Sequence, residues 1–167
     1  NYINNYTYNA PGQEDYLVSY TVDLQSASTA ELTFDVSYAR YGVGFEDGLR
    51  VDVSTDCGLT WTPTGYLKVG LTLATAGTVT SLFTPTSAAQ WRKDTINFTP
   101  WVGNKVLVRF TNINDYGNSL YIDNVTMTSV VNNVTLNLSL FLEGYYSGAG
   151  QMEPVLFNAG LSTNPLV

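Results

Sequence analysis

Apolar and polar residues alternate with a period of two in several short stretches of the chain. The first stretch spans residues 32–38, and the pattern recurs at 49–53, 105–110 and 120–122. Because successive side chains of a strand point to opposite faces of a sheet, each stretch predicts a half-buried strand. The cleanest alternation, at residues 134–142, predicts a further strand. Gly, Asn, Asp and Pro border these stretches, so the pattern indicates an all-β sandwich.

Two breaks interrupt this pattern. Residues 71–89 are uncharged and mostly small, which predicts a long crossing loop or an irregular edge. The second break, at residues 130–133, separates a sandwich module at residues 1–130 from a C-terminal β extension at residues 131–167. The extension is too short to build its own core. It is therefore expected either to pack on the module or to begin a second one.

Composition narrows the function classes. The chain of 167 residues has 7 Lys and Arg against 14 Asp and Glu, a net charge of -7, no His and one Cys. Triads that contain His, His/Cys zinc sites and an internal disulfide are thereby excluded, and no catalytic residue is predicted. The acidic balance disfavours nucleic acid as a partner. No apolar run approaches the roughly 20 residues of a membrane span, and low charge with abundant Asn, Thr and Tyr favours an extracellular protein.

One local motif predicts a hairpin. Residues 54–61 have the form Ser-x-Asp-x-Gly-x-Thr-Trp, which resembles the Asp-box hairpin of sialidases and many secreted β proteins. In such a turn Asp56 accepts backbone N–H bonds, Gly58 supplies a left-handed conformation and Trp61 packs as an anchor. The motif predicts stability and no chemistry.

Acidic residues occur in adjacent pairs, Glu14 with Asp15 and Glu46 with Asp47. Adjacent carboxylates repel each other unless water or a cation lies between them, and oxygen ligands favour Ca²⁺. The terminal strands of a sandwich often lie side by side, which would bring Glu14 and Asp15 near Asp123. The residues leave three interpretations open: a structural Ca²⁺ site, a solvated acidic face, or paired carboxylates for glycoside hydrolysis.

Three tyrosines that are expected in loops are candidate ligand-binding residues. Sugar rings stack on exposed aromatic faces, whereas most aromatic side chains of a sandwich belong to its core or anchor its hairpins. The three candidates are Tyr41, Tyr66 and Tyr116.

Several motifs, taken in order, resemble one kind of secreted bacterial module. They are residues 12–19 (GQEDYLVS), 32–38 (LTFDVSY), 47–58 (DGLRVDVSTDCG), 91–92 (WR) and 117–125 (GNSLYIDNV). Over roughly residues 6–130 the order is similar to that of the choice-of-anchor J, MAM-like and cleaved-adhesin group of jelly-roll modules. Such modules are common in large Bacteroidetes proteins exported by the type IX system, including secreted metalloproteases and surface adhesins.

The resemblance implies a calcium-stabilised, non-catalytic jelly roll of two antiparallel sheets. By position, the Ca²⁺ ligands would be Glu14, Asp15, Asp47 and Asp123. The implied function is binding or adhesion within a larger secreted or cell-surface protein, with a surface glycan or a protein as ligand and other modules of the same polypeptide as partners. Residues 134–157 resemble the opening of another β module.

Three alternatives accompany this leading hypothesis: one within the binding class, one structural and one enzymatic. The chain is expected to be a carbohydrate-binding module of a secreted enzyme if loop Tyr and Asn residues hold sugars. It is expected to be a subunit of a surface fibre if residues 134–167 add a strand to a neighbouring copy and so drive self-assembly. A glycosidase that works with carboxylates alone is the enzyme alternative.

Overall fold

A computed structural model describes residues 2–131, 146–148 and 151–152. The chain divides into two compact units, Asn1–Asn132 and Asn133–Val167. In the second unit the described part is an antiparallel pair of short strands, β10 (Tyr146–Gly148) and β11 (Gln151–Met152). The strand predicted at residues 134–142 lies outside the described residues.

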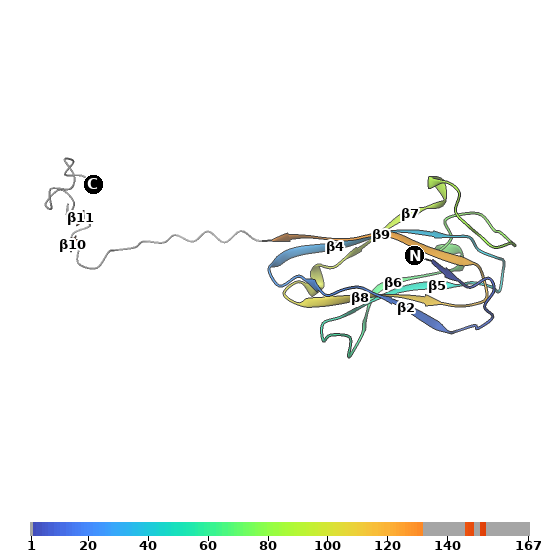
Figure 1. The fold of residues 1–167 in the computed structure, drawn as a ribbon, viewed down its shortest axis with the longest axis horizontal. Coiled ribbons are helices and arrows are strands. Elements are labelled where there is room, and N and C mark those ends of the chain that lie inside the picture. The colour runs from blue at the N-terminus through green and yellow to red at the C-terminus, as the bar shows by residue number, and fades with distance from the viewer. Residues whose placement is uncertain (1, 132–145, 149–150, 153–167) are drawn as a thin grey trace. The chain divides into compact units, whose positions relative to one another are not determined.

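Two antiparallel sheets form the first unit, and Figure 1 shows them stacked face to face. The first sheet has the strand order β1-β9-β4-β7 and the second has the order β2-β8-β5-β6, with β3 also paired to β8. The first sheet comprises β1 (Tyr2–Asn4), β9 (Ser119–Val131), β4 (Ala27–Tyr38) and β7 (Arg92–Asn97). The second comprises β2 (Glu14–Val18), β8 (Lys105–Ile113), β5 (Gly48–Ser54), β6 (Thr62–Val69) and β3 (Val22–Asp23).

The chain passes from one sheet to the other between β1 and β2, between β3 and β4, between β4 and β5, and again at each step from β6 to β9. This repeated crossing is the jelly-roll arrangement, and the all-β sandwich that the sequence predicts is confirmed. Residues 71–89 carry one of the crossings, from β6 to β7. Among the described residues the helical elements are three short 3₁₀ turns, and no helix is long and apolar enough to cross a membrane. The turns are η1 (Gly70–Thr72), η2 (Ala88–Gln90) and η3 (Thr99–Trp101).

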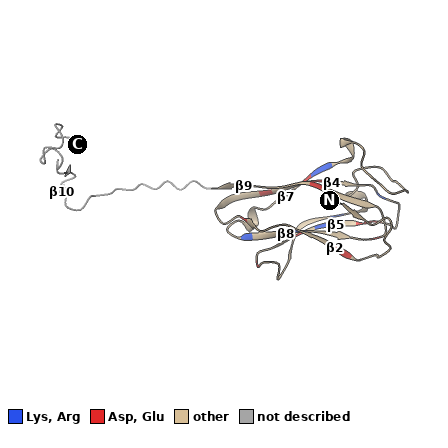
Figure 2. Ribbon diagram, in the orientation of Figure 1, with Lys and Arg blue, Asp and Glu red and all other residues tan. Residues whose placement is uncertain are grey.

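The core lies between the sheets, where the apolar residues of the alternating stretches meet. The Phe34 and Phe110 rings pack edge to face across the sandwich, with 5.0 Å between their centres. Each large apolar side chain buried in this way stabilises the fold by about 1.5–3 kcal/mol. Charged residues are sparse on the ribbon in Figure 2. The fully buried core side chains include Leu32, Val36, Leu49, Val51, Val53, Val106 and Leu120.

A polar cluster closes one edge of the sandwich, where β6 of the second sheet faces β7 of the first. Asp94 is 7% exposed and accepts hydrogen bonds from the Tyr66 hydroxyl at 2.6 Å and from Lys68 Nζ at 3.0 Å. Arg92 forms an ion pair with the same carboxylate at 2.9 Å. Burial alone would raise the pKa of Asp94, but these three donors outweigh it and lower the pKa to about 2. The two sheets are thus held together at this edge by one carboxylate.

Candidate ligand-binding site

Four aromatic side chains from three loops surround a cleft at one end of the sandwich. Tyr41 packs edge to face on Phe45 at 5.3 Å between ring centres, and Phe45 contacts Tyr116 at 6.2 Å. The ring centre of Tyr6 lies 6.1 Å from that of Tyr41. The enclosed space is about 390 Å³. We call this space the aromatic cleft; its lining residues are Tyr6, Thr7, Tyr41, Phe45, Tyr116 and Gly117.

The aromatic cleft brings together two of the three tyrosines that the sequence predicts as ligand-binding residues. Tyr41 comes from the loop between β4 and β5, and Tyr116 from the loop between β8 and β9. Tyr116 is 37% exposed and adopts a left-handed backbone with φ of 55°. The Asn114 side-chain oxygen accepts a 2.7 Å hydrogen bond from the Tyr116 N–H, which helps to hold this unusual conformation. Strained positions of this kind cluster at binding sites.

Asp47 organises the floor of the aromatic cleft. Its carboxylate is fully buried and accepts backbone N–H bonds from Asp115 at 2.8 Å, Gly117 at 3.2 Å and Asn118 at 2.7 Å. Asp115 in turn accepts a 2.9 Å bond from the backbone N–H of Glu46. The two loops that carry Tyr41 and Tyr116 are therefore held together by hydrogen bonds in both directions. Asp47 accepts from the backbone of the second loop, and Asp115 accepts from the backbone of the first.

Burial of the Asp47 carboxyl shifts its pKa. Removal from water raises the pKa of the Asp47 carboxyl above its ordinary value, while the three N–H donors oppose the rise. The Tyr38 hydroxyl, buried beside Asp47, has its pKa raised for the same reason. Asp47 thus acts on the loops through hydrogen bonds to their backbone.

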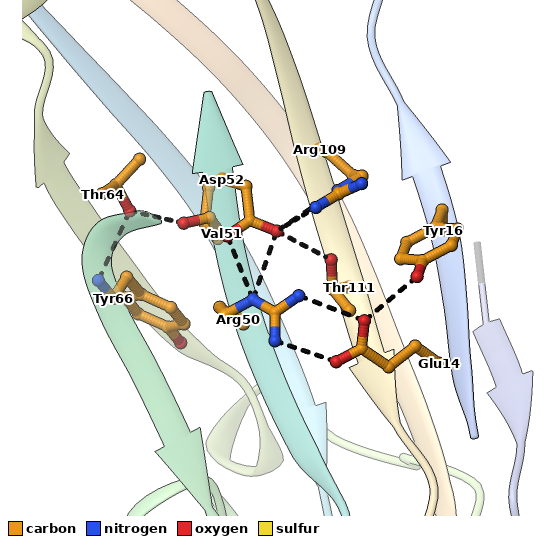
Figure 3. A network of polar contacts seen from close by, with 9 residues as sticks. All are labelled: Glu14, Tyr16, Arg50, Val51, Asp52, Thr64, Tyr66, Arg109 and Thr111. Carbon is orange, nitrogen blue, oxygen red and sulfur yellow. Dashed lines mark hydrogen bonds and ion pairs between the residues drawn. The ribbon is translucent and has the colours of Figure 1, made fainter. Parts of the chain in front are cut away.

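A second polar network covers the outer face of the second sheet and is drawn in Figure 3. Arg50 contacts Glu14 through two parallel bonds of 2.9 and 3.1 Å, and its Nε donates to Asp52 at 3.0 Å. Asp52, with a side chain only 2% exposed, also pairs with Arg109 at 2.9 Å and accepts from the Thr111 hydroxyl at 3.1 Å. The network joins three neighbouring strands, β2, β5 and β8.

Arg109 is enclosed by aromatic rings as well as by charge. Its guanidinium carbon lies 4.6 Å from the Tyr16 ring centre and 4.4 Å from the Trp61 ring centre. Trp61 ends the predicted Asp-box hairpin, in which Asp56 accepts the Thr60 N–H at 2.9 Å and Gly58 has φ of 88°. The hairpin forms as predicted, and its Trp anchors an arginine on the outer face of the sheet.

The four acids predicted as Ca²⁺ ligands do not converge. Glu14 points to the outer face of the second sheet, where Arg50 neutralises it, and Asp47 is committed to backbone N–H groups. Asp123 is exposed on the first sheet, directly opposite Asp35 in the β4–β9 register.

Asp15 faces the space between the sheets, and this placement does not support the expected meeting of the N-terminal acids with Asp123. Strands β2 and β9 belong to different sheets, and Glu14 and Asp123 occupy the outer faces of those sheets. Across residues 2–131, 146–148 and 151–152, no group of three or more acidic or Cys side chains is arranged to hold a metal ion. Calcium binding therefore stays a prediction that the placement of these four acids does not support.

Tyr66 is also placed differently from its prediction. It belongs to strand β6 and not to a loop, its hydroxyl donates to Asp94, and its ring packs edge to face on Phe34 at 5.3 Å. These contacts make Tyr66 part of the closed sandwich edge. They leave its ring face and its hydroxyl committed within the fold.

Two residues of the aromatic cleft, Tyr6 and Phe45, were not among the predicted ligand-binding residues. Phe45 lies four positions after Tyr41 in a loop that contains Gly42 and Gly44, so a search for aromatic residues within one Gly-rich loop would have included it. Tyr6 comes from the loop between β1 and β2, and only the tertiary fold brings it to Tyr41.

No protein-family model matches this chain, and no curated protein matches it. The fold assignment therefore rests on the strand order and register, and the resemblance carried by the sequence motifs stays a prediction.

Proposed function

We propose that this chain is a non-catalytic extracellular binding or adhesion module of a larger secreted or cell-surface protein, and that the aromatic cleft is its ligand site. The observation that carries the proposal is the convergence of four aromatic side chains from three separate loops. Aromatic residues on loops above a rigid scaffold are typical of binding sites. The hydrogen bonds that Asp47 and Asp115 accept from the backbone support the proposal, because they fix the loops of Tyr41 and Tyr116 before a ligand arrives.

A surface glycan fits this cleft better than a small apolar molecule. The faces of sugar rings pack on aromatic rings, and hydroxyl groups need nearby polar partners. Thr7, Tyr41 and Tyr116, which line the cleft, each carry a hydroxyl group that can serve as such a partner. The same surface suits a protein loop that presents sugar-like polar and apolar groups together, so a protein ligand is the alternative within this function.

We expect substitution of either cleft tyrosine to weaken retention on a glycan without unfolding the chain. Tyr41→Ala and Tyr116→Ala each remove one stacking surface and should weaken binding about tenfold. A glycan array probed with the wild-type and variant chains measures this loss. Tyr20→Ala is the matched control, because Tyr20 is 96% exposed and lies outside the cleft. Retention that survives both cleft substitutions would contradict the proposal, and an array on which no glycan binds would exclude the glycan ligand.

An open strand edge favours a second function, assembly of copies by strand addition. Strand β1 pairs only with Ser119–Tyr121 of β9, so residues 123–131 have β4 on one side and no paired strand, among the described residues, on the other. Residues 124–131 contain no charged side chain, and Val125, Val130 and Val131 are exposed. Long uncharged edges rich in β-branched residues invite another strand. In this alternative the chain is a subunit of a surface fibre.

A charge on this edge is expected to prevent such assembly. Val125→Lys and Val130→Lys together place two cations where a second strand would pair, which is a common protection of natural sheet edges. The double variant should remain monomeric at concentrations where the wild-type chain forms larger species in analytical ultracentrifugation. Val43→Lys, at an 84% exposed loop position, is the control. A wild-type chain that stays monomeric throughout would rule the fibre function out.

A further inference from the structure

A cavity of about 430 Å³ lies between the sheets at the edge formed by β1 and β2. Its walls are core side chains from both sheets, among them Leu17 and Phe110 from the second sheet and Leu120 from the first. The volume falls within the roughly 300–1,000 Å³ typical of ligand pockets. We call it the inter-sheet pocket. It shares no lining residue with the aromatic cleft.

The inter-sheet pocket reflects a difference between the two edges of the sandwich. At the β6–β7 edge, Asp94 draws Tyr66, Lys68 and Arg92 into a polar cluster that joins the sheets. At the β1–β2 edge, strand β1 is only three residues long. The sheets leave a space there that opens onto the core.

Two polar side chains face this apolar space. Asn112 is 1% exposed, and its amide is paired with that of Asn5 by two bonds of 3.0 Å. Asp15 accepts only long bonds, 3.4 Å from Asn112 Nδ2 and 3.4 Å from Gln13 Nε2. A carboxylate with such weak donors retains most of its capacity to accept a hydrogen bond from a ligand.

Among the described residues, no Lys or Arg side chain pairs with the Asp15 carboxylate. All seven Lys and Arg residues lie in the described part of the chain, and none of them forms an ion pair with Asp15. Glu14, the residue before it, is paired with Arg50. Asp15 therefore places an uncompensated negative charge against an apolar pocket, and a positively charged ligand group would be complementary to it.

Tyrosines at the pocket strengthen this complementarity. Tyr2 and Tyr8 line the pocket and are 62% and 50% exposed. The faces of aromatic rings attract cations, and ammonium groups are recognised by such rings together with a carboxylate. The Tyr2 ring is held in place by stacking on Tyr121 at 5.2 Å, and the Tyr8 hydroxyl donates to Gln13 at 3.0 Å.

We propose that the inter-sheet pocket binds an organic ammonium ion with a short apolar body. The nitrogen lies at Asp15, where it donates to the carboxylate oxygens, and the hydrocarbon part fills the space beside Leu17 and Phe110. Asn112 stays paired with Asn5, and its long contact with Asp15 leaves that carboxylate able to accept from the ligand. This site is separate from the aromatic cleft, so the proposal does not depend on the function assigned to that cleft.

The test compares three ligands of one shape on the full chain by isothermal titration calorimetry. Hexylammonium should bind saturably, 1-hexanol about tenfold more weakly, and hexanoate not at all, because only the ammonium complements Asp15. Equal binding of hexylammonium and 1-hexanol would show an apolar cavity without charge recognition and would overturn the proposal. So would the failure of hexylammonium to saturate at millimolar concentrations. These outcomes need no variant.

Variants then identify the charge that recognises the ligand. Asp15→Asn keeps the shape of the side chain and should remove the preference for hexylammonium over 1-hexanol. Asp23→Asn, at an exposed carboxylate on β3, should leave that preference unchanged. Should Asp15→Asn fail to fold, Tyr8→Ala at the half-exposed loop position tests the same site and is expected to weaken hexylammonium severalfold. A preference that Asp15→Asn leaves unchanged overturns the assignment of the site. If Asp15→Asn does not fold, an unchanged affinity of Tyr8→Ala for hexylammonium overturns it.

Discussion

Replacement of Asp52 by Asn is expected to lower the free energy of unfolding by about 3 kcal/mol. Asp52 is 1% exposed and is the shared partner of Arg50 and Arg109. The amide of the Asp52→Asn variant has the same shape but no charge, so Arg109 loses its one carboxylate partner among the described residues. The amide also places an NH₂ group where the carboxylate accepted hydrogen bonds from the arginines. Arg50 retains Glu14, and both arginines keep some contact with water, which limits the loss. Urea denaturation at neutral pH measures the change.

Asp23→Asn provides the control for this experiment. Asp23 pairs with Lys105 at 3.8 Å, and both side chains are more than half exposed. Exposed pairs of this kind contribute about 0–1 kcal/mol, so this variant should unfold close to the wild-type midpoint. Similar losses in the two variants would show that the network in Figure 3 contributes no more than an ordinary surface ion pair.

The effect of Asp52→Asn should also depend on pH. Burial alone would raise the pKa of Asp52, but the hydrogen bonds from Arg109 and Arg50 outweigh it and hold the pKa below its ordinary value. A carboxyl with a lowered pKa stabilises the folded state fully above its unfolded pKa of about 3.9 and loses that contribution as the pH falls through the folded pKa. The difference between wild type and variant should therefore be constant near neutral pH and shrink below about pH 4.

The second large effect is expected from Gly117→Ala, which should destabilise the chain by about 2–3 kcal/mol. A Cβ at this position would collide with Asp47 Oδ2 and would lie 2.9 Å from both the Phe45 carbonyl oxygen and the Tyr38 hydroxyl. These atoms are backbone or buried and cannot swing aside. The loop must then move and carry Tyr116 with it, so weaker binding in the aromatic cleft should accompany the loss of stability. Thermal unfolding and the glycan array measure the two effects.

Gly77→Ala distinguishes this collision from a general effect of replacing glycine. No atom lies within 4 Å of the position that a Cβ at Gly77 would occupy, and its backbone is not left-handed. This substitution should be neutral or stabilise the chain by up to about 1 kcal/mol, because it restricts the unfolded state. A Gly117→Ala chain as stable as Gly77→Ala would mean that the loop accommodates the added carbon.

Strands whose inward residues are apolar could be predicted from the sequence, and strands closed by polar contacts could not. Residues 32–38 and 49–53 alternate clearly because Phe34 and Val51 face the core. Strands β6 and β7 show no such pattern, since their inward positions include Tyr66 and Asp94, which close the edge by hydrogen bonds. In these two strands, polar groups that form hydrogen bonds within the fold alternate with residues that face solvent. Hydropathy does not distinguish the two kinds of position.

Some residues of the candidate site could likewise be predicted from the sequence, and others could not. Loop position made Tyr41 and Tyr116 candidates, and the fold brings them together around Phe45. The role of Asp47 could not be inferred because its partners are backbone N–H groups about 70 residues further along the chain. A sequence shows which carboxylates exist, but it does not show whether a cation, an arginine or a peptide group will occupy them.

The first strands of the sandwich pair with its last strands, and this pairing sets an order of events during synthesis. Strand β1 pairs with Ser119–Tyr121, and β2 pairs with Arg109–Ile113, so the first contact closes a loop of more than 110 residues and the second a loop of more than 90. Loops of this length are slow to close and cannot close before the later partner exists. Residues 2–4 and 14–18 therefore have no strand partner until the chain has been synthesised as far as β9 and β8, respectively. These two pairings therefore form late, and a chain that ends before residue 119 lacks the partner for its own first strand.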